Sequence, residues 1–88
     1  MAIQAQRVDQ DGIYVKVSSG LEVTITPTVI KDKYDNETGS DEQRRIKTRI
    51  YIKSLIEGAL GSYQLPTAKM DLDFDPETGI PVNFEVIS

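Results

Sequence analysis

Three aspartates alternate near the end of the chain: Asp71, Asp73 and Asp75. Acidic residues at the first, third and fifth positions also open the calcium loop of helix-loop-helix proteins. The rest of that motif is missing, because Pro76 stands where the loop needs glycine and Val82 where it needs a bidentate glutamate. On a strand, such carboxylates lie on one face about 6.6 Å apart, too far for neighbours to share an ion tightly. We therefore expect a solvated strand face and no metal site.

Five basic residues occur within ten positions, with no acid between them, in an otherwise acidic chain: Arg44, Arg45, Lys47, Arg49 and Lys53. Long basic side chains commonly cover the apolar edges of a helix while their charged heads stay in water, which is one interpretation. The other is an electrostatic docking surface that meets the aspartate row of a neighbouring copy or another acidic patch. Nucleic-acid binding is not expected, because no aromatic residue interleaves these cations and the net charge of -4 opposes it.

The residue types available for catalysis are few. The chain has no Cys, His or Trp, which excludes thiolate nucleophiles, disulfides, Cys/His metal sites and imidazole acid-base chemistry. Its serines have no histidine to act as base, and it has no glycine-rich phosphate loop. We expect no enzyme activity, no catalytic residues and no cofactor.

Length and composition limit the architecture. A chain of 88 residues closes one core, so residues 1–88 are expected to form a single domain. The net charge also argues against anionic membranes, and no apolar run approaches the roughly 18 residues of a membrane span. The first residues lack a basic start followed by an apolar run. A cytoplasmic or periplasmic location stays open.

Alternating apolar and polar residues predict two strands in the first third of the chain, at residues 13–17 and 21–26. Residues 3–8 alternate more weakly and provide an optional further strand. Pro27 should end regular pairing or confine that part of the strand to a sheet edge. The predicted inward-facing residues are Ile13, Val15 and Val17 in one strand and Leu21, Val23 and Ile25 in the other.

A second hairpin is predicted at the end of the chain, where Leu72 and Phe74 alternate with the aspartates. Residues 75–79 form its turn, because Pro76 presets φ and Gly79 accepts a left-handed conformation. In the last strand, the residues predicted to share one face are Ile80, Val82, Phe84 and Val86.

The middle of the chain predicts a polar segment followed by a long helix. Residues 31–41 are interpreted as a mobile surface loop. Ser40 and Gln43 have the spacing of a capping box, in which each side chain binds the other residue's amide. The helix is then expected to cover residues 41–60, with Gly61 as its left-handed stop.

The predicted helix is apolar on more than one side. Its second half has one apolar face, formed by Ile52, Leu55, Ile56, Ala59 and Leu60, which is expected to cover the sheet. Ile46 and Ile50 are displaced from that face by about a quarter turn or more, and Tyr51 lies on the opposite flank. Either the loop and the N-terminal strand wrap the helix, or its early turns contact another subunit or partner.

Together these elements predict an α+β fold in the order β-β-(β)-α-β-β. A mainly antiparallel sheet of four to five strands would carry the one long helix on one face. The other sheet face would remain open to solvent or to a partner.

Two resemblances to known families bear on function. Residues 44–65, with the sequence IKSLIEGALGSYQL from Ile52, resemble small accessory or structural proteins of tailed bacteriophages. That resemblance implies non-catalytic assembly into a virion head, neck or tail. Residues 74–81, FDPETGIP, are similar to a hairpin of a small bacterial lipoprotein domain of unknown function, whose members usually carry a lipidated export signal.

These observations favour a small structural protein that oligomerises or docks into a larger complex, with protein as its partner. The alternative is a monomeric envelope or regulatory domain that binds one protein partner through its free sheet face. The candidate interaction residues are Arg44, Arg45, Arg49, Lys53, Ile46, Ile50, Tyr51, Asp71, Asp73 and Asp75.

Overall fold

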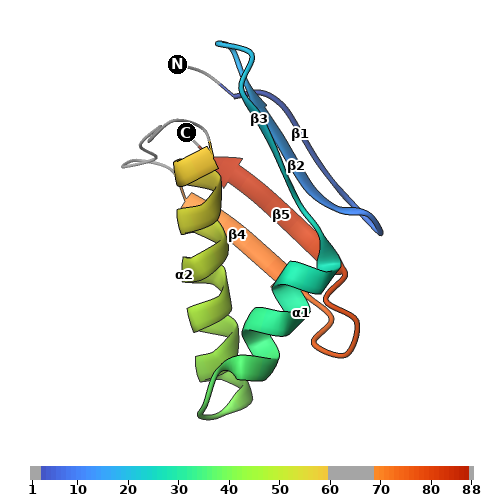
Figure 1. The fold of residues 1–88 in the computed structure, drawn as a ribbon, viewed down its shortest axis with the longest axis vertical. Coiled ribbons are helices and arrows are strands. Elements are labelled where there is room, and N and C mark those ends of the chain that lie inside the picture. Colours follow the sequence, from blue (N-terminus) through green and yellow to red (C-terminus); the bar gives the residue numbers. More distant parts are fainter. Residues whose placement is uncertain (1–2, 60–68, 88) are drawn as a thin grey trace.

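The computed structural model describes residues 3–59 and 69–87, in which three strands, two helices and two further strands follow one another (Figure 1). The elements are β1 (Ile3–Asp9), β2 (Gly12–Val17), β3 (Glu22–Ile25), α1 (Pro27–Asn36), α2 (Asp41–Ala59), β4 (Lys69–Phe74) and β5 (Pro81–Ile87). The α+β class is therefore confirmed. Neither described helix is long and apolar enough to cross a membrane.

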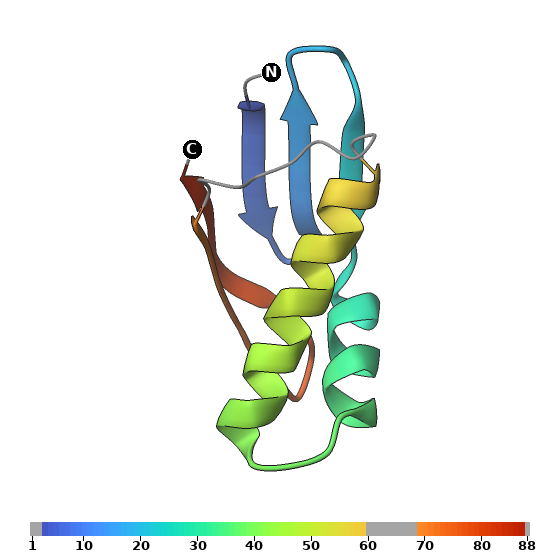
Figure 2. The same cartoon turned by 90° about the vertical axis from the view of Figure 1, so that its left-hand side faces the viewer.

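The strands form two antiparallel sheets, β1-β2-β3 and β4-β5, so the prediction of a single four- to five-stranded sheet is wrong. β5 lies beside β1, but no backbone ladder joins them in the described part of the chain (Figure 2). The pairing within each sheet has one irregularity, between Ile3 and Ala5 in β1 and between Asp73 and Phe74 in β4.

The core lies between the sheets and the helices. Ile13, Val15 and Val17 of β2 are fully buried, which confirms the predicted inward face of that strand. Ile52 and Ile56 of α2 are also fully buried, as predicted for the face that covers the sheet. The remaining buried apolar residues are Ile25, Ile30, Tyr34, Leu72, Phe74 and Phe84.

The sequence pattern does not predict the first helix, α1, so the prediction of a single helix is wrong, whereas the long helix predicted from residue 41 is present as α2. Residues 31–36, assigned to a surface loop, form its second half. Pro27 does end β3, but a proline is also favourable in the first turn of a helix, where its missing amide is not needed. Ile30 and Tyr34, four residues apart, then face the core. The high polarity of residues 31–36 reflects an exposed helix face.

The start of α2 agrees with the prediction. The Ser40 amide donates to Gln43 Oε1 at 2.9 Å, and the Gln43 amide donates to Ser40 Oγ at 3.2 Å, so both halves of the capping box are formed. Asp41 and Glu42 occupy the first turn, where negative charge is favourable. Leu60 and Gly61, the predicted end and stop of the helix, lie outside the described residues.

The predicted face of the last strand is partly wrong. Phe84 is buried, but Val82 is 66% exposed. Phe74 pairs with Pro81 and Asp73 with Asn83, so Val82 is an extra residue in β5. A bulge of this kind shifts the alternation by one residue. Pro81 therefore faces the interior, and Val82 faces solvent.

The turn between β4 and β5 packs against the first turn of α1. Gly79 has a φ of 79°, and its amide donates to the Asp75 carbonyl at 2.7 Å. A methyl group added to Gly79 would lie 2.1 Å from the carbonyl oxygen of Pro27. Glycine is therefore required both by the left-handed backbone and by the close approach of α1.

We predict that Gly79→Ala lowers the free energy of unfolding by roughly 2 kcal/mol or more, because strain and a steric clash coincide. Gly20→Ala is the matched control. Gly20 also has a positive φ, of 96°, but a methyl group there would meet no atom within 4 Å. Urea unfolding of both variants checks this, and equal losses would contradict the role given to the Pro27 contact.

Candidate functional site

A cluster around Tyr34 joins the two helices to the C-terminal hairpin. Tyr34 is 6% exposed, and its hydroxyl donates a hydrogen bond to Asp41 Oδ1. Its ring meets the ring of Phe74 edge-on, with centroids 5.7 Å apart. On another side, the Arg44 guanidinium carbon lies 4.0 Å from the Tyr34 ring centroid, and Arg44 Nε donates to the Tyr34 carbonyl at 3.2 Å. One side chain thus links α1, α2 and β4.

Arg45 makes the second connection between α2 and β4. Its Nε donates to Asp41 Oδ2 at 2.8 Å, and its Nη1 lies 3.3 Å from Asp73 Oδ1 and 3.1 Å from the Phe74 carbonyl oxygen. The guanidinium also lies 5.4 Å from the centroid of the Phe74 ring. Arg45 thus uses two of its nitrogens within its own chain, and Asp73 has an ion-pair partner there.

Most of the predicted basic strip is engaged in the same way. Lys47 Nζ lies 3.3 Å from the Thr38 carbonyl oxygen and 3.6 Å from Glu37 Oε2, and Lys53 Nζ lies 3.8 Å from Glu57 Oε1. Arg49 differs. It is exposed and makes no hydrogen bond or ion pair with residues 3–59 or 69–87. Arg49 instead lines a hollow together with Leu72, Asp73 and Asn83 of the β4-β5 hairpin.

The charged groups of the Tyr34 cluster shift each other's pKa. The hydrogen bond from Tyr34, followed by that from Arg45, lowers the pKa of the Asp41 carboxyl from its ordinary value of 3.8. The same hydrogen bond to Asp41 raises the pKa of the Tyr34 hydroxyl. Lys33 lowers the pKa of Glu37 through a hydrogen bond. These shifts accompany structural ion pairs, which perturb pKa values without implying catalysis.

The aspartate row does not form one site. Asp73 is paired with Arg45, and Asp75 Oδ1 accepts from the Glu77 amide at 2.9 Å within its own turn. Asp71 lies in β4, but its side chain is outside the described part. Among the residues that the structure describes, no three acidic side chains are close enough together to hold a metal ion.

The apolar candidates of α2 lie on its outer side. Ile46 is 45% exposed, Ile50 62% and Tyr51 38%, so neither the α1 segment nor β1 wraps them completely. Ile50 points nearly opposite to the buried Ile52. Sequence reasoning missed Thr48, which is fully buried and donates to the Arg44 carbonyl at 2.8 Å. Its position four residues before Ile52 could have indicated the buried face.

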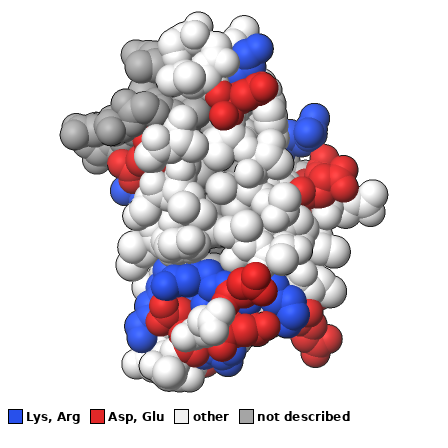
Figure 3. Space-filling view, in the orientation of Figure 1, with Lys and Arg blue, Asp and Glu red and all other residues white. Residues whose placement is uncertain are grey.

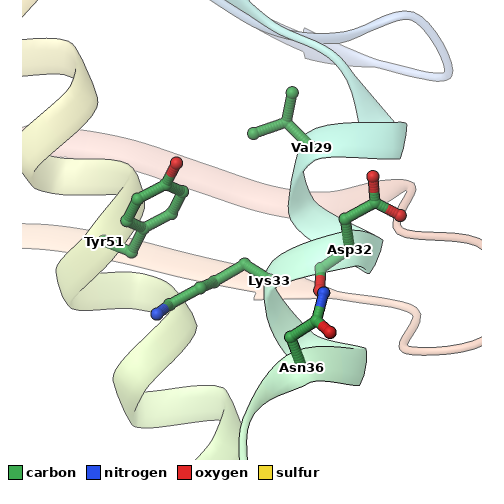
Figure 4. A pocket seen from close by; sticks show the side chains of 5 residues that line it. All are labelled: Val29, Asp32, Lys33, Asn36 and Tyr51. Carbon is green, nitrogen blue, oxygen red and sulfur yellow. The ribbon is translucent and has the colours of Figure 1, made fainter.

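A hollow of about 390 Å³ lies between α1 and α2. Figure 4 shows Tyr51 of α2 and Lys33 of α1 pointing toward each other across it. Lys33 Nζ lies 5.0 Å from the Tyr51 ring centroid, so the aromatic face is already in contact with a cation. Charged side chains form a band over the lower ends of the two helices, and the surface above it is largely uncharged (Figure 3). The other residues that line the hollow are Val29, Asp32 and Asn36.

No protein-family model, curated protein or solved structure matches the chain.

We predict that Arg45→Met destabilises the fold, whereas Arg49→Met leaves its stability nearly unchanged. The first substitution removes the cation that Asp41, Asp73 and the Phe74 carbonyl share, and the second removes a side chain without such contacts. Thermal unfolding of both variants measures the difference. Equal melting temperatures would show that the Arg45 contacts do not stabilise the protein.

We also predict that acid destabilises the protein partly through Asp41. Its folded pKa is below its unfolded value of 3.8, so its contribution is complete above that value and is lost as the pH falls through the folded pKa. Urea unfolding from about pH 5 downward should show this loss. Asp41→Asn should be less stable at neutral pH and should lose less on acidification, and an unchanged pH dependence would contradict the assignment.

Proposed function

We propose that this chain is a small non-enzymatic assembly protein that oligomerises or docks into a larger complex. The supporting observation is the outer side of α2, where Ile46 and Ile50 are exposed while Ile52 and Ile56 fill the core on the other side. A helix that packs against only one neighbouring surface needs apolar residues on only one side. A second apolar side supports a contact with another protein.

The expected contact is weak when only two chains meet. Full burial of an isoleucine contributes about 1.5–3 kcal/mol, so each half-exposed isoleucine offers about 1 kcal/mol. Association costs at least about 4 kcal/mol in lost freedom of motion. Contacts of this strength become sufficient when many copies are held together, because each further contact is then intramolecular.

A virion component is the form of this proposal that fits the resemblance of α2 and its continuation to phage accessory proteins. Symmetric particles repeat one contact many times, which suits a surface with two exposed isoleucines and few free charges. The engagement of Arg44, Arg45 and Asp73 in the fold supports a structural role for these polar residues.

Sedimentation velocity across a range of concentrations, in low and high salt, tests the proposal. We expect the average mass to rise with concentration, and to remain raised in high salt because the contact is mainly apolar. A strict monomer in every condition would count against self-assembly. It would favour the alternative, an envelope or regulatory domain that binds a different protein.

A further inference from the structure

The outer edge of β3 carries backbone groups that the described structure leaves unpaired. β3 lies at the end of its sheet, and no described strand or helix lies beside its outer edge (Figure 2). The Val17 amide donates to the Leu21 carbonyl at 3.0 Å, which makes these two residues a hydrogen-bonded pair. Such pairs alternate along an antiparallel ladder, so the N–H and C=O groups of Glu22 and Thr24 point away from β2. No residue in 3–59 or 69–87 forms a hydrogen bond with these groups.

The outer edges of β3 and β4 differ in how they are protected. On β4, the Phe74 carbonyl accepts a hydrogen bond from the Arg45 guanidinium at 3.1 Å. On β3, the charged side chain is that of Glu22, and the Tyr14 hydroxyl of β2 donates to its carboxylate at 2.6 Å. This bond holds the carboxylate over the face of its own sheet. An unprotected edge is a template for a strand of another molecule.

The apolar side chains of β3 are covered less toward the start of the strand. Ile25 is 5% exposed, Val23 is partly buried and Leu21 is 46% exposed. Leu21 is nevertheless the cross-strand partner of Val17, which is fully buried, so both side chains lie on the same face of the sheet. The exposed Leu21 thus extends the apolar face of the sheet to its open edge.

The edge of β3 is complementary to itself in one antiparallel register. With Val23 opposite Val23 of a second copy, each Leu21 lies opposite Ile25 of the other copy. Glu22 then lies opposite Thr24, so their edge-facing groups exchange hydrogen bonds and a hydroxyl meets a carboxylate. If the two-fold axis lay one residue earlier, two carboxylates would oppose each other. If it lay one residue later, Leu21 would oppose the proline that begins α1.

We propose that β3 pairs with β3 of a second copy, antiparallel about a two-fold axis at Val23, so that both copies share one continuous sheet. Because the edge of β4 is protected, pairing of equal edges ends at two copies. This surface is separate from the outer side of α2, and the inference goes beyond the contact proposed there. Two short strands bury less than the roughly 800 Å² per partner of a standard interface, so the dimer forms at high concentration.

Single cysteines test the register, because the chain has none of its own. Val23→Cys places two thiols in a directly opposed, non-hydrogen-bonded pair, whose Cα atoms lie about 4.5 Å apart and within disulfide range. Thr24→Cys is the matched control, since its counterpart lies two residues along the other strand, about 8 Å away. Under mild oxidation, Val23→Cys should form the linked dimer at least tenfold faster on a non-reducing gel. Equal rates would overturn the proposed pairing.

Leu21→Asp provides a second test, by sedimentation. It should raise the dissociation constant at least tenfold, because an apolar contact is lost on both sides of the axis. Val82→Asp is the matched control, since Val82 is 66% exposed and lies on β5. Circular dichroism verifies that every variant is folded.

Ile50→Asp separates this inference from the contact proposed on α2, and it should leave the β3 dimer intact. Association that persists in Leu21→Asp but is lost in Ile50→Asp would overturn this inference and support assembly through α2 alone. A monomer at all concentrations, without cross-linking of Val23→Cys, would overturn this inference together with the self-assembling form of the proposed function.

Discussion

The two sheets of this protein meet without a described backbone ladder, and side chains must therefore hold them together. The helices provide this connection. Ile52 and Ile56 fill the core beneath α2, while Tyr34, Arg44 and Arg45 tie the start of α2 to α1 and β4. Because only a few elements hold the two sheets together, polar side chains near the core also contribute contacts between them. The apolar side chains that stay exposed are those that this packing leaves uncovered.

That remainder is largely one side of one helix. A core this small accepts a single face of α2, so apolar residues elsewhere on the helix stay in water. Ile46 and Ile50 are such residues. The small size of the core thus explains both why polar side chains pack around Tyr34 and why apolar residues stay exposed on the outer side of α2.

Local patterns predicted the parts of the fold that local chemistry decides. The capping box at Ser40 and Gln43 and the inward face of β2 follow from spacing alone. The errors involve residues whose role depends on the rest of the fold. Pro27 both ends a strand and begins a helix. The bulge at Val82 depends on how β5 pairs with β4. For the candidate site, the sequence indicated the basic strip and the exposed apolar residues, but not that Arg45 would bind Asp73 of its own chain. Such a contact depends on tertiary packing.

Arg45 also lies at one edge of β4. Among the described strands, β4 pairs only with β5, so none of them covers the other edge of β4. The Asp75 amide donates to the Ile80 carbonyl, on the side of β5. The Phe74 carbonyl belongs to the same peptide group and points the opposite way, toward the other edge of β4. Arg45 occupies this carbonyl with a charged group. A strand from another molecule would have to displace Arg45 before it could pair with β4 at this carbonyl, and a charged group in this position disfavours edge-to-edge aggregation.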